Sequence, residues 1–216
     1  ILAAALDCFA ERGFAATRLD EVAERAGVTK GTVYLYFANK DELFKELVRR
    51  ELLPNIERLE TAALLEGPAA AAIERLVGLW ATEVVTSKAA LLPKLMIAEG
   101  GNFPELARFY LDEVIRRGRS IVVGLLRRGV AAGEFRPIDT EHVAYLIFAP
   151  LIFAVLWRHT FEPHDDAPLD VQAYARAHLD VLFRGIRPAE ERPVDSGRTD
   201  HADPHPDREP KRGPPG

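Results

Sequence analysis

Residues 29–40 form a short polar stretch with the composition of a surface that contacts phosphate groups and base edges. The stretch contains two lysines, threonines and tyrosines but no acidic residue, and Gly31 lies within it. Hydroxyl and ammonium groups suit phosphate oxygens and base edges, and a glycine lets the backbone approach them closely. The stretch therefore predicts a nucleic-acid contact. The alternative is an indifferent solvated surface, which the absence of acidic residues disfavours.

Two helices are predicted to come before this stretch. Residues 1–13 carry apolar side chains, Cys8 among them, at helical spacing, and Gly13 follows as a C-terminal stop. Thr17 and Asp20 have the spacing of a capping box, in which the Thr17 hydroxyl accepts a backbone N–H. We therefore expect a second helix that begins near residue 18 and ends before Gly27.

The third helix is predicted to follow Thr29, its N-cap. Because Val33 and Phe37 form its inward side, the outward residues are Lys30, Gly31, Thr32, Tyr34 and Tyr36.

A fourth helix is predicted to open with a second capping box at residues 39–42. Lys40 lies in its first turn, where a cation opposes the helix dipole and benefits from a bound anion. We therefore predict that Lys40 contacts phosphate; the alternative is a solvated lysine without a partner. Pro54 predicts a bend or an end near residues 50–54, which either transmits motion between domains or is an ordinary break between helices.

The run GFAATRLDEVAERAGVTKGTVYLYFANKDELF at residues 13–44 resembles the DNA-binding domain of the TetR family of bacterial transcriptional regulators. The pattern G-V-x-K-G-T-x-Y-x-Y-F-x-x-K-x-x-L is intact, and residues 1–46 are predicted to form a helix-turn-helix domain. The resemblance implies contacts to bases or nearby backbone from Thr29, Lys30, Thr32 and Tyr34, and contacts to phosphates from Thr17, Tyr36 and Lys40. The complete predicted DNA-binding set is Thr17, Arg18, Thr29, Lys30, Gly31, Thr32, Tyr34, Tyr36 and Lys40.

The remainder of the chain is also predicted to be helical. Helical spacing continues from residue 68 to residue 185 without strand-like alternation, so we expect an all-α fold of about nine helices. The arrangement of helices resembles the variable ligand-binding and dimerisation domain of the same family, here residues 47–187. Residues 188–216 are rich in Pro, Asp, Arg and Gly and are predicted to be disordered. Because the chain starts at Ile1 inside a helical pattern, we expect further residues before it, with the basic arm that such proteins often carry.

Residues 143–157 contain no charge and predict a helix that is buried on all sides, against its own domain and a partner subunit. The segment is shorter than the ~20 residues that cross a bilayer, so we do not predict a membrane protein. Residues 171–186 predict a last helix with one narrow polar stripe, whose other faces cover more than one neighbour. Two such helices from each subunit would form a four-helix interface around a two-fold axis, and a symmetric dimer reads the two half-sites of a palindromic operator. The predicted interface residues are Phe148, Ile152, Val155, Tyr174, His178 and Leu182.

The second domain contains more aromatic and soft side chains than the small N-terminal domain. Core packing is the simpler explanation, but the family resemblance implies that some of them line a cavity for a hydrophobic small-molecule effector. The candidate ligand-binding residues are Trp80, Glu83, Met96, Phe109, Tyr110, Phe148 and Phe153.

Composition and charge restrict the function further. A net charge of -5 argues against indiscriminate nucleic-acid coating, and the single cysteine, Cys8, excludes a disulfide framework and favours the cytoplasm. No metal-ligand spacing, cofactor motif or catalytic constellation is present, so we predict neither an enzyme nor a cofactor. We expect a DNA-binding transcriptional regulator, and repression only through the resemblance. The alternative is a helical interaction or scaffold protein without sequence-specific DNA binding.

Overall fold

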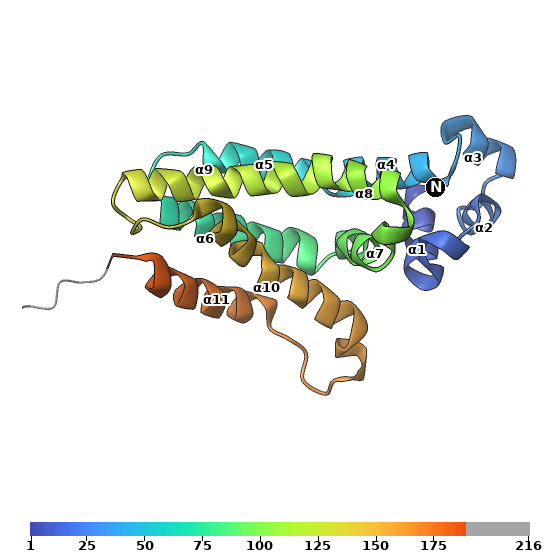
Figure 1. Cartoon of the computed structure of the whole chain (residues 1–216). Helices are drawn as coiled ribbons and strands as arrows, with labels where there is room; N and C mark the ends of the chain where they lie inside the picture. The colour runs from blue at the N-terminus through green and yellow to red at the C-terminus, as the bar shows by residue number, and fades with distance from the viewer. Residues whose placement is uncertain (189–216) are drawn as a thin grey trace, which may run out of the picture.

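The N-terminal helices pack around three phenylalanine rings at one end of an elongated molecule (Figure 1). This computed structural model describes residues 1–188, whose regular elements are all helices, which confirms the predicted all-α fold. α1 (Leu2–Ala16), α2 (Leu19–Arg25) and α3 (Lys30–Tyr36) surround Phe9, Phe14 and Phe44, with ring centroids 5.2–6.3 Å apart. Gly27, with φ +66°, makes the turn between α2 and α3, as predicted. Residues 189–216, where most of the predicted tail falls, lie outside the described range.

A break at Leu52 divides the long fourth helix near the predicted position. α4 (Lys40–Glu51) ends there, and α5 (Leu53–Ala63) begins with Pro54 in its first turn. Proline is tolerated in a first turn because its missing N–H would have no intrahelical partner. The apolar face of α4 packs into the N-terminal unit, and α5 runs on into the second domain (Figure 1).

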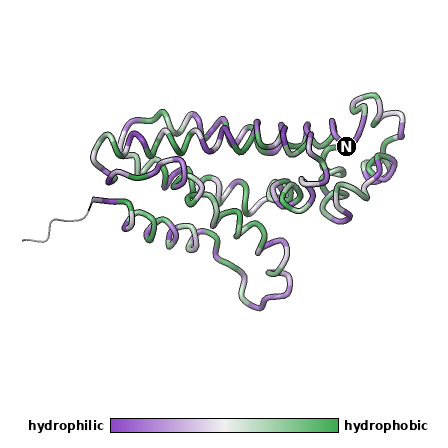
Figure 2. Tube along the Cα trace, viewed as in Figure 1, coloured by the Kyte–Doolittle hydropathy of each residue, from purple (hydrophilic) through white to green (hydrophobic). Residues whose placement is uncertain are grey.

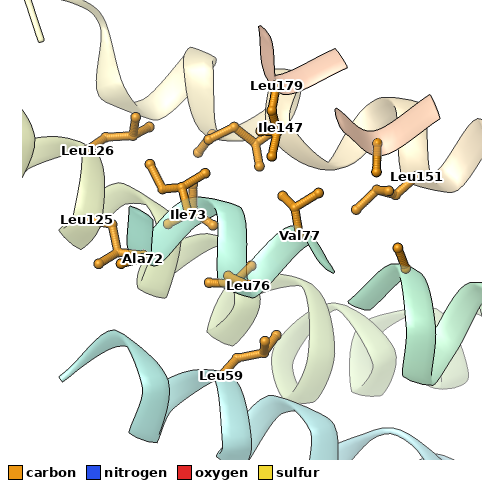
Figure 3. Packing of buried hydrophobic residues seen from close by; sticks show 14 of the residues in the cluster. Leu59, Ala72, Ile73, Leu76, Val77, Leu125, Leu126, Ile147, Leu151 and Leu179 are labelled. Carbon is orange, nitrogen blue, oxygen red and sulfur yellow. The ribbon is translucent and has the colours of Figure 1, made fainter. Parts of the chain in front are cut away.

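The second domain is a bundle of helices around an aliphatic core (Figure 3). Ile73, Leu76 and Val77 of α6 lie at its centre, between Leu59 of α5 on one side and Ile147 and Leu151 of α10 on the other. The helices that complete the domain are α6 (Ala69–Trp80), α7 (Leu91–Glu99), α8 (Pro104–Tyr110), α9 (Arg117–Ala131), α10 (Thr140–Thr160) and α11 (Val171–Ile186).

Two helices contain π-helical turns. Ala81–Val85 extends α6, and Leu111–Arg116 joins α8 to α9 in one nearly continuous rod. If α4 with α5, and α8 with α9, are each counted as one rod, residues 1–188 contain the nine helices that were predicted. π-Helical turns widen the helix locally and occur often at functional sites.

The long helix α10 is apolar over most of its length (Figure 2). It was predicted to be buried against its own domain and a partner subunit. In the single chain Tyr145, Leu146 and Phe153 are exposed, so burial of these side chains requires the partner subunit. Among residues 1–188 it is the one helix with the length and hydropathy that a membrane span needs, a property that core helices of soluble proteins share.

Candidate nucleic-acid interface and ligand cavity

α3 begins at a cap made by two threonines. The Thr29 hydroxyl oxygen accepts a hydrogen bond from the Thr32 backbone N–H at 3.1 Å, and the two hydroxyl oxygens lie 2.8 Å apart. Val33 is fully buried and fixes the rotation of α3 against the N-terminal unit. The predicted N-cap and the predicted inward residue are therefore both confirmed, and the outer face of α3 is free to meet a ligand.

That outer face carries aromatic and apolar side chains as well as hydroxyl groups. Tyr34 is exposed, and Leu35 and Tyr36 are 79% and 69% exposed. The predicted DNA-binding set does not include Leu35, because that prediction relied on polar side chains and leucine is apolar. An apolar side chain here suits the thymine methyl group in a major groove.

An acidic side chain of α2 borders this face. The Lys30 ammonium lies 2.9 Å from the Asp20 carboxylate, which raises the pKa of Lys30, and 5.7 Å from the centre of the Tyr34 ring. Arg18 is exposed, with its guanidinium 3.9 Å from the same carboxylate. The positive charge on the face is therefore smaller than residues 29–40 alone indicate.

Thr17 does not cap α2, so that prediction is wrong. Its side chain is 2% exposed, and its hydroxyl donates back to the carbonyl oxygen of Gly13 at 2.7 Å, with that of Cys8 at 3.2 Å. The Glu21 carboxylate instead accepts the Arg18 backbone N–H at 3.3 Å. Because the Thr17 hydroxyl is buried and satisfied, it has no free donor for a phosphate.

The Lys40 side chain binds the end of α1. Its ammonium donates to the carbonyl oxygens of Phe14, Ala15 and Thr17 at 2.5, 2.9 and 3.1 Å, and lies 4.6 Å from the centre of the Phe14 ring. An ammonium has three donors, and all three are used. Partial burial lowers the pKa of Lys40. This arrangement contradicts the alternative of a lysine without a partner, and a phosphate contact would have to replace one of these three bonds.

A cavity of about 510 Å³ lies between the second domain's helices. Four of the predicted ligand-binding residues line it: Trp80, Met96, Tyr110 and Phe148. Trp80 and Tyr110 each end a helix where a π-helical turn begins, so the local widening of α6 and α8 shapes the wall. Burial raises the pKa of Tyr110, whose phenol is therefore neutral.

The other three predicted ligand-binding residues lie outside the cavity wall. Glu83 is paired with Arg58 on the surface at 3.4 Å. Phe109 lies under the Arg49 guanidinium, 5.2 Å from it, and Phe153 packs against Trp157. These three residues lie on the same helices as residues that line the cavity, but their side chains point away from it. Helical spacing alone could not predict which face of each helix lines the cavity.

The cavity opens at a mouth that the sequence did not indicate. Ile97, Ile115 and Tyr145 line the cavity and are exposed, so they mark the opening between α7, the π-helical turn before α9, and α10. Arg119 lies at the same opening, donating to the Tyr145 hydroxyl at 3.1 Å and 3.6 Å from the Glu141 carboxylate. Apolar residues exposed around an opening suit the entry of a hydrophobic molecule.

The predicted dimer residues are divided between the interior and the surface. Val155 is fully buried within the chain, and Phe148 and Ile152 line the cavity. Val155 therefore cannot form an interface without unfolding, and this assignment is corrected.

On α11, by contrast, the predicted residues Tyr174, His178 and Leu182 are half-buried, and Val181 beside them is 72% exposed. Burial lowers the pKa of His178 and favours its neutral form. α10 and α11 lie side by side along one edge of the molecule (Figure 1), and Leu146 and Phe153 of α10 and Val181 of α11 are exposed.

The fold and these surfaces define a class of protein in which a helix-turn-helix unit is joined to a helical domain with an apolar cavity. Residues 1–47 match the bacterial regulatory proteins of the tetR family, and residues 64–184 match the tetracyclin repressor-like C-terminal domain. The chain belongs to the TetR family of bacterial regulatory proteins and is a DNA-binding transcriptional regulator.

Two relatives span nearly the whole described chain. The fatty acid metabolism regulator protein of Bacillus subtilis is 27% identical over 191 residues, covering 86% of this chain and 93% of that protein. The transcriptional repressor KstR2 of Mycobacterium tuberculosis is 30% identical over 189 residues, covering 86% and 89%.

Solved structures of related regulators have the same fold as this chain. The ketosteroid transcriptional regulator KstR2 of Mycobacterium tuberculosis superposes with a TM-score of 0.71 at 25% identity, covering 87% of this chain and 93% of that chain. The regulator FadR of Bacillus subtilis, solved in complex with stearoyl-CoA, gives 0.72 at 24% identity, covering 86% and 97%.

Proposed function

We propose that the protein is a ligand-responsive repressor that binds a palindromic operator as a homodimer in the bacterial cytoplasm. One observation carries the ligand response: the cavity and the DNA-reading unit share a packed cluster. Met96 and Tyr110, which line the cavity, belong to the same buried cluster as Phe14 of α1 and Leu47 of α4. Close-packed interiors transmit displacements, so a molecule that moves the cavity wall also moves α3.

α3 is proposed to read the operator in the major groove. Thr29, Thr32 and Tyr34 would contact bases or the adjacent backbone, with Gly31 allowing close approach. The phosphate contacts would come from Arg18 and Tyr36, and Lys30 would share its charge between Asp20 and the DNA. Lys40 and the Thr17 side chain are left out because their donors are already bound within the chain.

Dimerisation is proposed to occur through the uncovered faces of α10 and α11. Tyr174, Val181 and Leu182 of α11, with Leu146 and Phe153 of α10, give each face an apolar centre. Two copies related by a two-fold axis would cover these residues and set two α3 helices at half-site spacing.

The effector is proposed to have an apolar body, with any polar group at the mouth beside Arg119 and Tyr145. The wall is aliphatic and aromatic, and a volume of 510 Å³ accommodates a molecule of that kind. The stearoyl-CoA bound to one structural neighbour and the ketosteroid in the name of another support this class. Neither a metal nor a cofactor is proposed.

Replacing Tyr34 with phenylalanine is expected to change operator affinity unevenly among single-base operator variants. A base-edge hydrogen bond discriminates by about 1–3 kcal/mol, so affinity falls at one or two positions only. Tyr36→Phe serves as the matched control, because loss of a phosphate contact weakens all variants alike. Fluorescence anisotropy across the variant set measures both. A uniform loss for Tyr34→Phe would contradict the base contact.

Binding of an apolar effector is expected to change the fluorescence of Trp80 and release the operator. The chain has two tryptophans, and only Trp80 lines the cavity, whereas Trp157 packs between Phe153 and Phe161. Stearic acid, stearoyl-CoA and a 3-ketosteroid are suitable probes. The change should vanish in Trp80→Phe and persist in Trp157→Phe. If no probe alters either fluorescence or a gel shift, the proposed effector class is wrong.

A further inference from the structure

One carboxylate of the second domain binds the backbone of the DNA-reading unit. Glu99, the last residue of α7, accepts hydrogen bonds from the backbone N–H groups of Phe14 and Ala15, at 2.7 Å through Oε1 and 2.9 Å through Oε2. We call this pair of bonds the Glu99 contact. α7 and α1 lie against each other (Figure 1). Hydrogen bonds to an ionised carboxylate are stronger than neutral ones, and a bidentate pair also fixes orientation.

Gly13 makes this contact possible. Its φ of +80° interrupts the helical conformation inside α1, and the amide groups of Phe14 and Ala15 turn towards Glu99. A side chain at residue 13 would also place its Cβ atom 2.5 Å from Glu99 Oε1, closer than the two atoms can approach. A glycine is therefore needed both for the turn and for the approach of the carboxylate.

The same segment is bound from its other side by Lys40. The carbonyl groups of Phe14 and Ala15 accept hydrogen bonds from the Lys40 ammonium, while their N–H groups donate to Glu99. Lys40 is the first residue of α4 and follows α3 in the chain by a few residues. Glu99, the α1 segment and Lys40 thus form a continuous series of charge-assisted bonds from α7 to the start of α4, which follows α3 in the chain.

The other end of this series is the cavity wall. Pro93, Met96 and Ile97 of α7 line the cavity, and Glu99 lies less than one helical turn beyond Met96. On the basis of the proposed function, we propose that Glu99 is the positioning residue that transmits movement of α7 to the DNA-reading unit. A bound molecule that favours a shifted α7 then also favours a shifted α1 and α3.

Other contacts between the two parts are less directional. Phe14 packs against Phe103 at 4.7 Å between ring centroids, and apolar contacts of this kind tolerate sliding. Lys88 pairs with Asp7 at 2.7 Å, but the pair is exposed and contributes little. The apolar contacts keep the parts together when Glu99 is replaced by glutamine, whereas the charged bidentate pair is lost, because a glutamine amide has one acceptor oxygen and its NH2 group faces the other backbone N–H.

The test compares Glu99→Gln with Glu134→Gln in the full chain. Glu134 is a matched control because its carboxylate binds the backbone N–H groups of Ala69 and Ala70, at 2.8 and 3.2 Å, inside the second domain. Without DNA, the backbone amides of Phe14 and Ala15 should exchange hydrogen about ten-fold faster in Glu99→Gln than in the wild type or in Glu134→Gln, because local opening governs exchange.

The second measurement uses a DNA duplex that the wild-type protein selects from a random library. The wild type and both variants should bind this duplex with affinities that agree within about three-fold. Binding of the duplex should change the amide hydrogen exchange rates along α7 in the wild type and in Glu134→Gln, but not in Glu99→Gln. Exchange in α7 that still responds in Glu99→Gln, or that is lost equally in Glu134→Gln, would overturn the proposal. Failure of the wild type to select any duplex would contradict operator binding instead, and the DNA-free exchange rates would then decide whether the Glu99 contact holds α1.

Discussion

Replacing Val181 with glutamate is expected to convert the proposed dimer into a monomer and to weaken operator binding by at least about 100-fold, the lower part of the gain that two linked modules provide. Val181 is 72% exposed on α11, between the half-buried Tyr174 and Leu182. A carboxylate at the centre of an apolar interface would lose its hydration without gaining a partner, and the two-fold axis doubles that cost. Size-exclusion chromatography with light scattering measures the mass, and anisotropy measures the affinity.

Leu65→Glu is the control for this substitution. Leu65 is also an exposed apolar residue, but it follows α5, away from α10 and α11. The control protein should remain dimeric and bind the operator normally. A dimeric Val181→Glu protein would show that the subunits meet through another surface, and the proposed role of α11 would have to be abandoned.

Lys40→Ala is expected to lower the free energy of unfolding by about 2 kcal/mol, the range for hydrogen bonds to a charged group. The substitution removes the ammonium that three carbonyl groups share, and it loosens the end of α1 against α4. Urea unfolding at one fixed protein concentration measures the loss, because a dimer's apparent stability depends on concentration. Lys45→Ala, which breaks an i,i+3 surface pair with Glu42, should cost much less.

The salt dependence of operator binding distinguishes this role of Lys40 from a phosphate contact. Loss of one phosphate contact reduces the slope of log affinity against log salt by about 1. Lys40→Ala should leave that slope unchanged, whereas Arg18→Ala should reduce it. A stable Lys40→Ala protein with a reduced slope would restore the phosphate role.

Local patterns predicted most of the helices correctly. Thr29 caps α3 because its partner, the Thr32 N–H, is only three residues away. Pro54 breaks the helix between α4 and α5 because a proline lacks the backbone N–H that would bond to the preceding turn. Thr17 fits the same kind of local rule, but its hydroxyl found carbonyl groups earlier in the chain. The capping rule failed because the Thr17 hydroxyl could bond either to an N–H group at the start of α2 or to carbonyl groups of α1. The packing of α1 places the carbonyl groups within reach.

The sequence by itself determined the class of this protein: an all-helical chain that begins with a helix-turn-helix unit and presents a hydroxyl-rich helix. Those features follow from spacing over a few residues, where chain connectivity restricts what can meet. Only the tertiary structure decided that Lys40 binds carbonyl groups 23–26 residues before it, and that Glu99 binds amides 84–85 residues before it. A charged side chain goes to whichever unsatisfied backbone groups the packing brings near, and helical spacing carries no information about that distance.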